Sequence, residues 1–429
     1  MPSATTLRYA TRFQCIGGAC EDSCCAHAWN VAVDRPDFVR LERAMSATPA
    51  SRGEFERGCV RGGGVGAPAQ SYAALQRTPA GECVFLTTDR LCSIHATHGA
   101  AALPRVCATY PRVLSRIGRR LSVTDTLSCP EAARLCLLAS DAVRPETVDG
   151  GDLAVLRVRH RVPAGSRDPF VWNYFMIRKA FLELLGGDRY PIVSRFHFAA
   201  RLARRLDAVR KTPRRGAAAP RLLAAISACS SPAALARWDR ECPEKGVSGA
   251  APFLLVQQVL LALPRTPATD RFTALVDAVH GPWLERRAGG DGCDLRGGAL
   301  WEAYRASRAR WEGEFPDRIA RYIAHYSANY WMRDPFTAAP DLLTHLLRLL
   351  ARVAVIRFLL FAHPALADLD EANDTREGRQ KALDRAVVEV VYGFSRAIEH
   401  ADAMLELLHR MMRVHRVQGT GRVAEFAGF

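Results

Sequence analysis

Seven cysteines near the start of the chain fall into three short groups whose spacing suits metal binding. They are Cys15-x4-Cys20-x3-Cys24-Cys25, Cys83-x8-Cys92 and Cys107. A free cysteine is usually a small, buried, isolated apolar residue. Clustered thiolates can converge on one point, which a zinc ion or an iron–sulfur cluster requires. We therefore expect a metal site in this part of the chain.

The spacing leaves the number and type of metals open. Cys20 and Cys24 lie about one helical turn apart or around one tight loop, whereas the adjacent Cys25 points elsewhere. His95, three residues after Cys92, adds an imidazole at a spacing suited to a shared ligand site. Two structural zinc ions, one iron–sulfur cluster with spare thiols, or a zinc ion and a cluster all fit the count. Buried thiols without a metal are the alternative.

The composition, with 49% apolar and 24% charged residues among 429, is typical of a water-soluble globular protein. The most apolar stretch, 353–362, is too short to span a bilayer and is interrupted by Arg357. Residues 1–13 lack the apolar core and cleavage site of a secretory signal. We therefore expect no membrane contact and a cytoplasmic location, where thiols stay reduced and clustered cysteines favour metals over disulfides.

The chain is basic, with a formal net charge of +15, and only four of its 59 basic residues are lysines. A solvated basic surface is the simpler interpretation of this charge. Attraction to an acidic protein or to nucleic acid is the functional one. No motif interleaves aromatic and basic residues in the way that stacks bases, so nucleic acid is not favoured as a partner.

The apolar periodicity predicts a mainly α protein in two parts. Residues 1–140 are expected to form a Cys-rich metal-binding region with short strands, because 29–33 and 119–126 alternate apolar and polar residues. Residues 46–70, rich in Gly, Ala, Pro and Arg, lack the strand and helix context of a phosphate-binding loop and predict a surface loop. Residues 141–429 are expected to form a large helical domain.

The helical domain is predicted from amphipathic patterns that bury one face against neighbouring helices. The patterns cover 172–185, 195–211, 222–263, 271–279, 300–315, 319–331, 341–361 and 380–414. Neither the glycine pattern of a dinucleotide-binding fold nor a P-loop occurs in the chain.

The order of motifs along the chain resembles the flagellin lysine-N-methylase family. The matching cysteine blocks are FQCIGGACEDSCC at 13–25, CVFL at 83–86, CSIH at 92–95, LPRVC at 103–107 and LSCPEAARL at 127–135. In the helical part, 326–336 resembles the family's Asn-Tyr segment and 394–400 its Phe-Ser-Arg…Glu-His signature. The cysteine blocks are shared with a wider group of zinc- or iron-chelating proteins, so the helical blocks make the match specific.

The resemblance implies a protein-lysine N-methyltransferase that moves a methyl group from S-adenosylmethionine to lysines of flagellin. It also implies an iron–sulfur cluster, of the 4Fe-4S type, in the cysteine site, with zinc as the alternative metal. The cysteines at family motif positions are Cys15, Cys20, Cys24, Cys25, Cys83, Cys92, Cys107 and Cys129.

Lysine methylation requires a neutral amine in line with the methyl sulfonium, so the protein has to desolvate and align the lysine. Tyrosines commonly line such channels, which makes Tyr110, Tyr326 and Tyr330 candidates, a place in the core being the alternative for each. The sequence does not place the S-adenosylmethionine site.

Arg396, Glu399 and His400 share one face of a predicted helix. They form a buried polar network, a substrate contact or a surface ion cluster. Two functions of other classes remain open: an iron–sulfur or zinc-binding redox or structural protein without methyl transfer, and a helical binding module held by zinc. The size of the helical part argues against a bare electron carrier.

Overall fold

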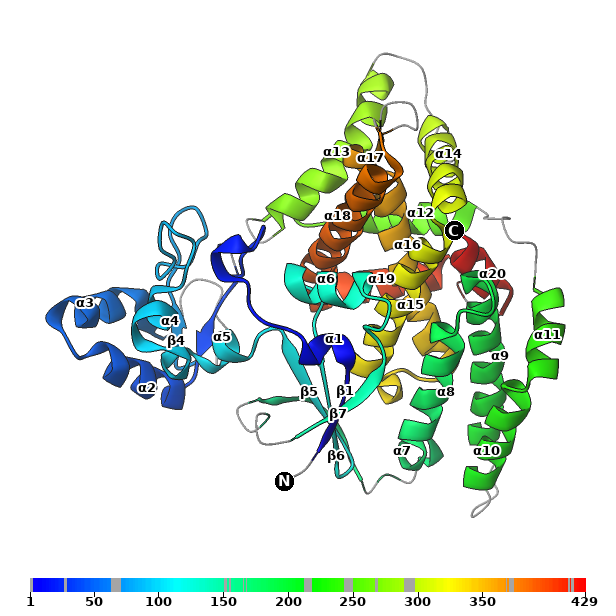
Figure 1. Ribbon diagram of the computed structural model, residues 1–429, viewed down its shortest axis with the longest axis horizontal. Helices are drawn as coiled ribbons and strands as arrows, with labels where there is room; N and C mark the ends of the chain where they lie inside the picture. Colours follow the sequence, from blue (N-terminus) through cyan, green and yellow to red (C-terminus); the bar gives the residue numbers. More distant parts are fainter. Residues whose placement is uncertain are drawn as a thin grey trace.

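The fold is seen in a computed structural model (Figure 1). The residues that it describes are 3–26, 29–62, 71–149, 153, 156–164, 166, 168–211, 218–242, 250–266, 269–288, 298–367, 369, 374–415, 417 and 420–429. The prediction of a mainly α chain with a few short strands and a large helical part is confirmed. No helix in the described ranges is both long and apolar enough to cross a membrane.

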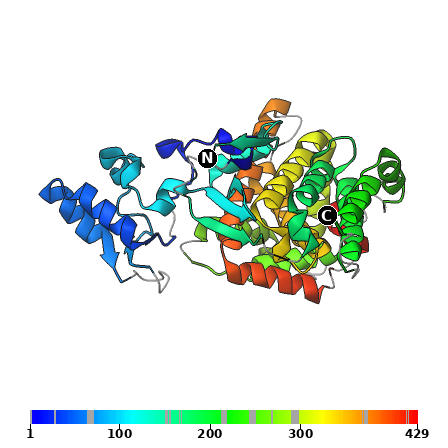
Figure 2. The same ribbon diagram turned by 90° about the horizontal axis from the view of Figure 1, so that it is seen from below.

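Residues 29–62 and 71–107, here named the cysteine lobe, project from one side of the molecule (Figures 1 and 2). The lobe contains a three-stranded sheet in the order β2-β4-β3. Its elements are β2 (Ala32–Val33), α2 (Arg35–Met45), α3 (Pro49–Gly58), β3 (Cys59–Arg61), β4 (Ala73–Leu75), α4 (Ser93–His98) and α5 (Arg105–Thr109). Asp34 caps α2 by accepting the Asp37 amide hydrogen bond. Phe38, Phe55 and Phe85 are buried in the small core of the lobe.

A five-stranded sheet connects the lobe to the helices. Its order is β7 (Pro145–Val148), β1 (Ala4–Leu7), β6 (Arg120–Asp125), β5 (Arg112–Ile117) and β8 (Val158–Val162). β5 and β6 form a hairpin whose turn begins at Gly118, where a φ of +59° favours glycine. Strands from both sides of residue 140 share this sheet.

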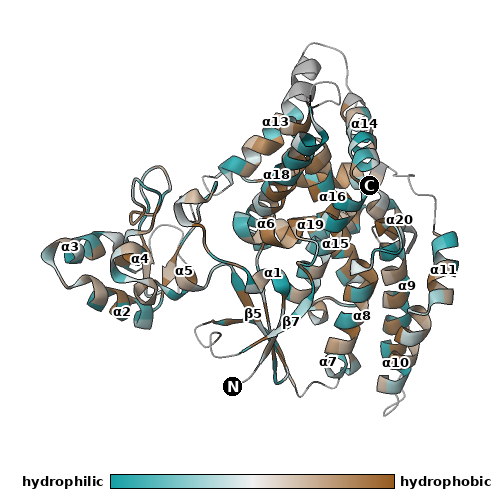
Figure 3. Ribbon diagram, viewed as in Figure 1, coloured by the Kyte–Doolittle hydropathy of each residue, from teal (hydrophilic) through white to brown (hydrophobic). Residues whose placement is uncertain are grey.

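The helical body buries most of the apolar core. Its helices are α1 (Arg8–Thr11), α6 (Pro130–Leu138), α7 (Pro169–Trp172), α8 (Tyr174–Gly186), α9 (Ile192–Lys211), α10 (Ala218–Cys229), α11 (Pro232–Arg240), α12 (Ala250–Leu261), α13 (Asp270–Ala288), α14 (Ala299–Glu314), α15 (Pro316–Arg333), α16 (Leu342–Phe361), α17 (Pro364–Ala367), α18 (Arg376–Phe394), α19 (Asp402–Val414) and α20 (Thr420–Gly428). α16 is buried on nearly every side, as its largely apolar sequence requires. Peripheral helices such as α11 carry hydrophilic as well as hydrophobic residues (Figure 3).

The structure differs from the sequence-based elements in two places that matter for the site. The single helix predicted over 380–414 is wrong: α18 ends at Phe394, a π-helical turn covers Ser395–Glu399, and α19 begins at Asp402. The apolar stripe continues through the break, so periodicity does not reveal it. π-helical turns within helices occur frequently at functional sites.

The surface loop predicted over 46–70 is wrong in its first half. Thr48 caps α3, and Pro49 occupies its first turn, where proline is favoured. Phe55 on α3 is buried against Phe38, so the segment contributes to the core of the lobe. Residues 63–70 lie outside the described part of the chain.

Candidate functional site

A cleft of about 970 Å³ lies between the cysteine lobe and the helical body. Figure 2 shows these two parts on either side of the strands that join them. The lobe side is lined by Cys24, Trp29, Asp34, Asp37 and Arg105. The body side is lined by Tyr330, Arg333, Asp334, His345, Arg348, Arg352, Arg396, Glu399, His400 and His409. Both helical segments of the predicted family signature, 326–336 and 394–400, therefore meet at this cleft.

Glu399, at the end of the π-helical turn, is the centre of a buried ionic network. Its carboxylate accepts hydrogen bonds from Arg333 at 2.7 and 2.8 Å, from the Tyr326 hydroxyl at 2.8 Å and from the Ser395 hydroxyl at 2.7 Å. Arg352 Nε lies 3.5 Å from the same carboxylate. Burial opposes ionisation of Glu399, but the two guanidiniums outweigh it and hold its pKa well below the usual range.

The three predicted tyrosines lie at or directly behind the cleft wall. Tyr110 and Tyr330 line it, whereas Tyr326 donates to Glu399 from behind. Tyr330 stacks on His345, with 4.6 Å between ring centroids. Burial raises the pKa of Tyr110 and Tyr330 well above the ordinary phenol value. Both phenols therefore stay protonated and act as hydrogen-bonding groups rather than as bases.

His400 joins the π-helical turn to the sheet. Its Nε2 lies 3.0 Å from the hydroxyls of both Thr126 and Ser128. The Ser128 hydroxyl is also 2.9 Å from the Tyr110 hydroxyl, so Tyr110, Ser128 and His400 form a continuous chain of hydrogen bonds. Burial, assisted by the charge of Arg333, lowers the pKa of His400 to about 4. The imidazole is therefore neutral at pH 7.

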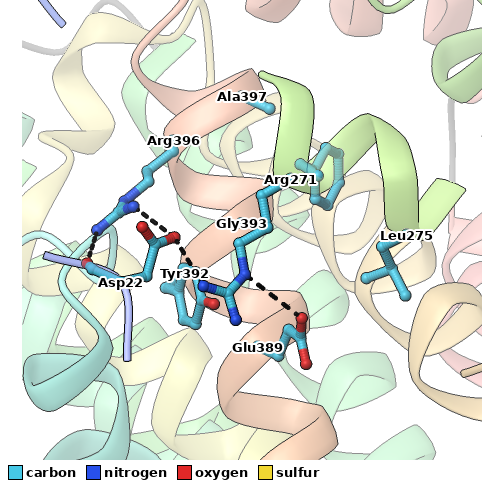
Figure 4. Close-up of a pocket in the computed structure, with 9 residues that line it drawn as sticks. Asp22, Arg271, Leu275, Glu389, Tyr392, Gly393, Arg396 and Ala397 are labelled. Carbon is cyan, nitrogen blue, oxygen red and sulfur yellow. Dashed lines mark hydrogen bonds and ion pairs between the residues drawn. The ribbon is translucent and has the colours of Figure 1, made fainter. Parts of the chain in front are cut away.

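Arg396 holds the first cysteine group against the helical body. Its guanidinium donates to the backbone oxygens of Ser128 and Asp22, each at 2.8 Å, and pairs with the Asp22 carboxylate at 2.7 Å. Arg271 lies 3.9 Å from the same carboxylate and 3.8 Å from Glu389. Figure 4 shows the two arginines on either side of Asp22. Because Asp22 lies between Cys20 and Cys24, these contacts fix the cysteine loop relative to the cleft.

The structure brings four of the eight candidate cysteines together at the core of the cysteine lobe, three from the lobe itself and Cys25 from the segment just before it. Cys25, Cys83, Cys92 and Cys107 pack in one apolar cluster, and the Cys83 amide donates to the Cys25 oxygen at 2.8 Å. The Cys25 thiol is hydrogen-bonded to the thiols of Cys24 and Cys92. Burial and the thiols of Cys25, Cys83 and Cys92 raise the pKa of Cys107.

Cys15, Cys20 and Cys129 do not belong to this cluster. Cys20 and Cys129 are close enough to each other for their charges to interact, and Cys15 is exposed. Thiol ligands drawn from separate segments suit zinc or an iron–sulfur cluster, and a bound cation would deprotonate them. Within the described ranges, no three His, Cys, Asp or Glu side chains are already arranged to hold a metal ion.

Sequence reasoning singled out Arg396 and His400 but not the other basic residues of the body side, Arg333, His345, Arg348, Arg352 and His409. Arg352 and Arg357 are almost fully buried within the apolar helix α16. A charged residue inside an apolar run needs a partner, which for Arg352 is Glu399 and for Arg357 is Glu312. The charged residues that interrupt the apolar sequence of α16 were the signal from which these buried ion pairs could have been predicted.

Acidification is expected to destabilise the fold because two buried histidines, His325 and His345, are neutral. Burial lowers the pKa of His325 to about 4 and that of His345 to about 3. The unfolded chain binds these protons from about pH 6.5 downward. The contribution of these histidines to the free energy of unfolding is therefore fully present above about pH 6.5. It decreases as the pH falls, until the pH reaches the pKa values of the folded protein. Each histidine contributes about 1.4 kcal/mol per pH unit in this window.

Urea unfolding at a series of pH values between about 7 and 5 measures this effect. The variant His325→Gln removes one of these two titrating groups and retains a donor for the Cys136 oxygen. Its free energy of unfolding is expected to fall less steeply with acid than that of the unmodified protein. Equal slopes for the two proteins would show that His325 is not held neutral.

Comparison with known proteins agrees with the motifs at the cleft. The family described as FliB lysine N-methylase C-terminal domain matches residues 178–424, more than half of the chain. A lysine-N-methylase of Salmonella typhimurium is 27% identical over 146 residues, which are 33% of this chain and 34% of that protein. The flagellar biosynthetic protein FliU of Salmonella muenchen is 27% identical over 146 residues, 80% of its length.

The aligned region thus spans about a third of the length of the Salmonella typhimurium lysine-N-methylase. No solved structure matches the chain. The family match covers the whole of α15, α16 and α18 and the π-helical turn, which supply the body side of the cleft. On this evidence the chain belongs to the FliB lysine N-methylase C-terminal domain family.

Proposed function

We propose that this chain is a protein-lysine N-methyltransferase that uses S-adenosylmethionine as methyl donor and flagellin as protein substrate. The observation that carries the proposal is the convergence of both family segments, 326–336 and 394–400, on one large cleft within the family match. The names of the relatives, lysine-N-methylase and a flagellar biosynthetic protein, support the reaction and the substrate. We propose the cytoplasm as its location, because free thiols persist there.

The charge of the cleft supports a route to the neutral amine that methyl transfer needs. Eight arginines but only five carboxylates line it, and Glu399 and Asp334 are already paired with Arg333. A lysine ammonium that enters loses solvation and meets excess positive charge, and both effects lower its pKa. The lysine is then expected to give its proton to solvent on entry.

The tyrosines and His400 are suited to orient the amine. The hydroxyls of Tyr110 and Tyr330 are neutral, and their oxygens accept hydrogen bonds from an incoming N–H. When bound, the donor supplies a methyl group on a positively charged sulfur. The amine lone pair forms the new N–C bond as the S–C bond breaks, so the positive charge passes from sulfur to nitrogen. Alignment of these atoms is the main contribution of the cleft.

We propose that Cys25, Cys83, Cys92 and Cys107 are the principal ligands of an iron–sulfur cluster, with zinc as the alternative metal. These thiols lie in the core of the cysteine lobe, and of the candidate cysteines only Cys24 lines the cleft. This position favours a metal that stabilises the wall of the cleft over one that contacts the substrate. A metal-binding redox or structural protein without methyl transfer is the second candidate, and the same placement supports it.

Purification without oxygen, followed by metal analysis and a methyl-transfer assay, tests both parts. Iron and acid-labile sulfide of about four per chain, with broad absorbance near about 400 nm, are expected for a 4Fe-4S cluster. Lysine methylation of flagellin, read by mass spectrometry and dependent on S-adenosylmethionine, is expected for the enzyme. A metal-loaded, folded protein that methylates no lysine would favour the redox or structural function.

A further inference from the structure

The wall of the cleft formed by α16 and α19 carries an unusual concentration of basic groups. His345, Arg348 and Arg352 are spaced along one face of α16, and His409 on α19 lies near them. We name these four residues the basic floor. The charges of Arg348 and Arg352 act on both histidines, which confirms that the four side chains are close together.

Arg348 is the member of the basic floor without a counterion. Arg352 pairs with Glu399 and lies over the Tyr330 ring, 5.1 Å from its centroid. Among the described residues, no carboxylate lies within ion-pair distance of the half-buried Arg348. Burial and the neighbouring charges of Arg352 and Arg413 lower the pKa of Arg348, which Tyr330 and Asp341 only partly offset.

The two histidines supply further unused donors. His345 is 2% exposed and lines the cleft, and its Nε2 has no hydrogen-bond partner among the described residues. His409 Nε2 is likewise buried without a described partner. Buried polar atoms in proteins are nearly always hydrogen-bonded, so two such nitrogens facing one cleft indicate a missing ligand. A guanidinium and imidazole N–H groups are the donors that recognise a carboxylate.

We propose that the basic floor is a carboxylate subsite that binds the α-amino-acid end of the methyl donor, with Arg348 as its principal contact. This assignment rests on the proposed function and places the donor, for which the sequence offered no site. The carboxylate accepts from the Arg348 guanidinium and from the Nε2–H groups of His345 and His409. The adenosine end then extends along the cleft. An acidic side chain of the protein substrate is the other source of a carboxylate.

Calorimetric titration with two nucleosides distinguishes these sources. S-adenosylhomocysteine carries the aminocarboxylate, and 5′-methylthioadenosine is the matching thioether nucleoside without it. The unmodified protein is expected to bind S-adenosylhomocysteine at least about tenfold more tightly, as one charge-assisted contact provides. Arg348→Gln is expected to remove that preference and to change the affinity for 5′-methylthioadenosine by less than about twofold.

Arg410→Gln is the matched control, because Arg410 is an exposed arginine on α19 that does not line the cleft. It is expected to bind both nucleosides like the unmodified protein. Thermal unfolding of Arg348→Gln is expected to be unchanged, since no ion pair is lost. A full preference for S-adenosylhomocysteine in Arg348→Gln would overturn the subsite while leaving the enzyme assignment intact. Failure of both nucleosides to bind the unmodified protein would overturn the donor assignment and the subsite together.

Discussion

Replacement of Glu399 by alanine is expected to lower the free energy of unfolding by about 3–5 kcal/mol, the cost of leaving buried charges without a partner. Arg333 and Arg352 are 8% and 4% exposed; without Glu399, Arg352 loses its carboxylate partner and Arg333 keeps only Asp334. The Tyr326 hydroxyl loses its acceptor as well. Urea unfolding at pH 7 measures the change through the transition midpoint.

Two comparisons separate the network from an ordinary ion pair. Glu399→Gln keeps an acceptor for Tyr326 but removes the charge. Its free energy of unfolding is therefore expected to lie between those of the unmodified protein and Glu399→Ala. Glu389→Ala removes a half-exposed carboxylate that lies 3.8 Å from Arg271, and is expected to cost less than about 1 kcal/mol. Equal destabilisation by Glu399→Ala and Glu389→Ala would show that the buried network does not stabilise the cleft.

Substitution of Cys107 by alanine is expected to abolish binding of the proposed metal and to unfold the cysteine lobe. Cys107 packs against Cys25, Cys83 and Cys92, and binding of a structural metal contributes about 10 kcal/mol in small metal domains. Iron, sulfide and zinc per chain report the metal. Limited proteolysis of 29–107 reports the fold of the lobe.

Cys59→Ala is the control for the loss of a buried thiol. Cys59 is 4% exposed in the same apolar core but belongs to none of the motifs. It is expected to keep the full metal content and a protected lobe. Retention of metal by Cys107→Ala, or its loss from Cys59→Ala, would mean that a different set of thiols is responsible.

The helical class of the fold follows from local pattern, and so does most of the order of its helices. Apolar residues at helical spacing locate α9, α15 and α16 within a few residues of their observed bounds. The pattern does not reveal the π-helical turn at Ser395–Glu399, because a shift of one residue in hydrogen bonding leaves the apolar stripe continuous. The buried Glu399 carboxylate is paired through tertiary contacts with Arg333 and Arg352.

Part of the candidate site could also be predicted. The cysteine spacing indicated a convergence of thiols, and four of them do pack together. Of the three tyrosines named from the chemistry of lysine, Tyr110 and Tyr330 line the cleft, and their role there stays a prediction. The role proposed for Arg348 could not be predicted from the sequence. Whether Arg348 has a carboxylate partner depends on where the fold places the carboxylates near the end of α15 and in the π-helical turn. A side chain's counterion is a long-range property that one sequence does not encode locally.

The most direct test of the account is to block the cleft and measure lysine methylation of flagellin. Ala338 is an exposed residue on the cleft wall, so Ala338→Trp fills the opening without disturbing the core. Ala233→Trp places the same bulk on an exposed position of α11, away from the cleft. We predict that the unmodified protein and Ala233→Trp methylate flagellin, whereas folded Ala338→Trp does not. Undiminished methylation by Ala338→Trp would contradict the assignment of this cleft as the active site.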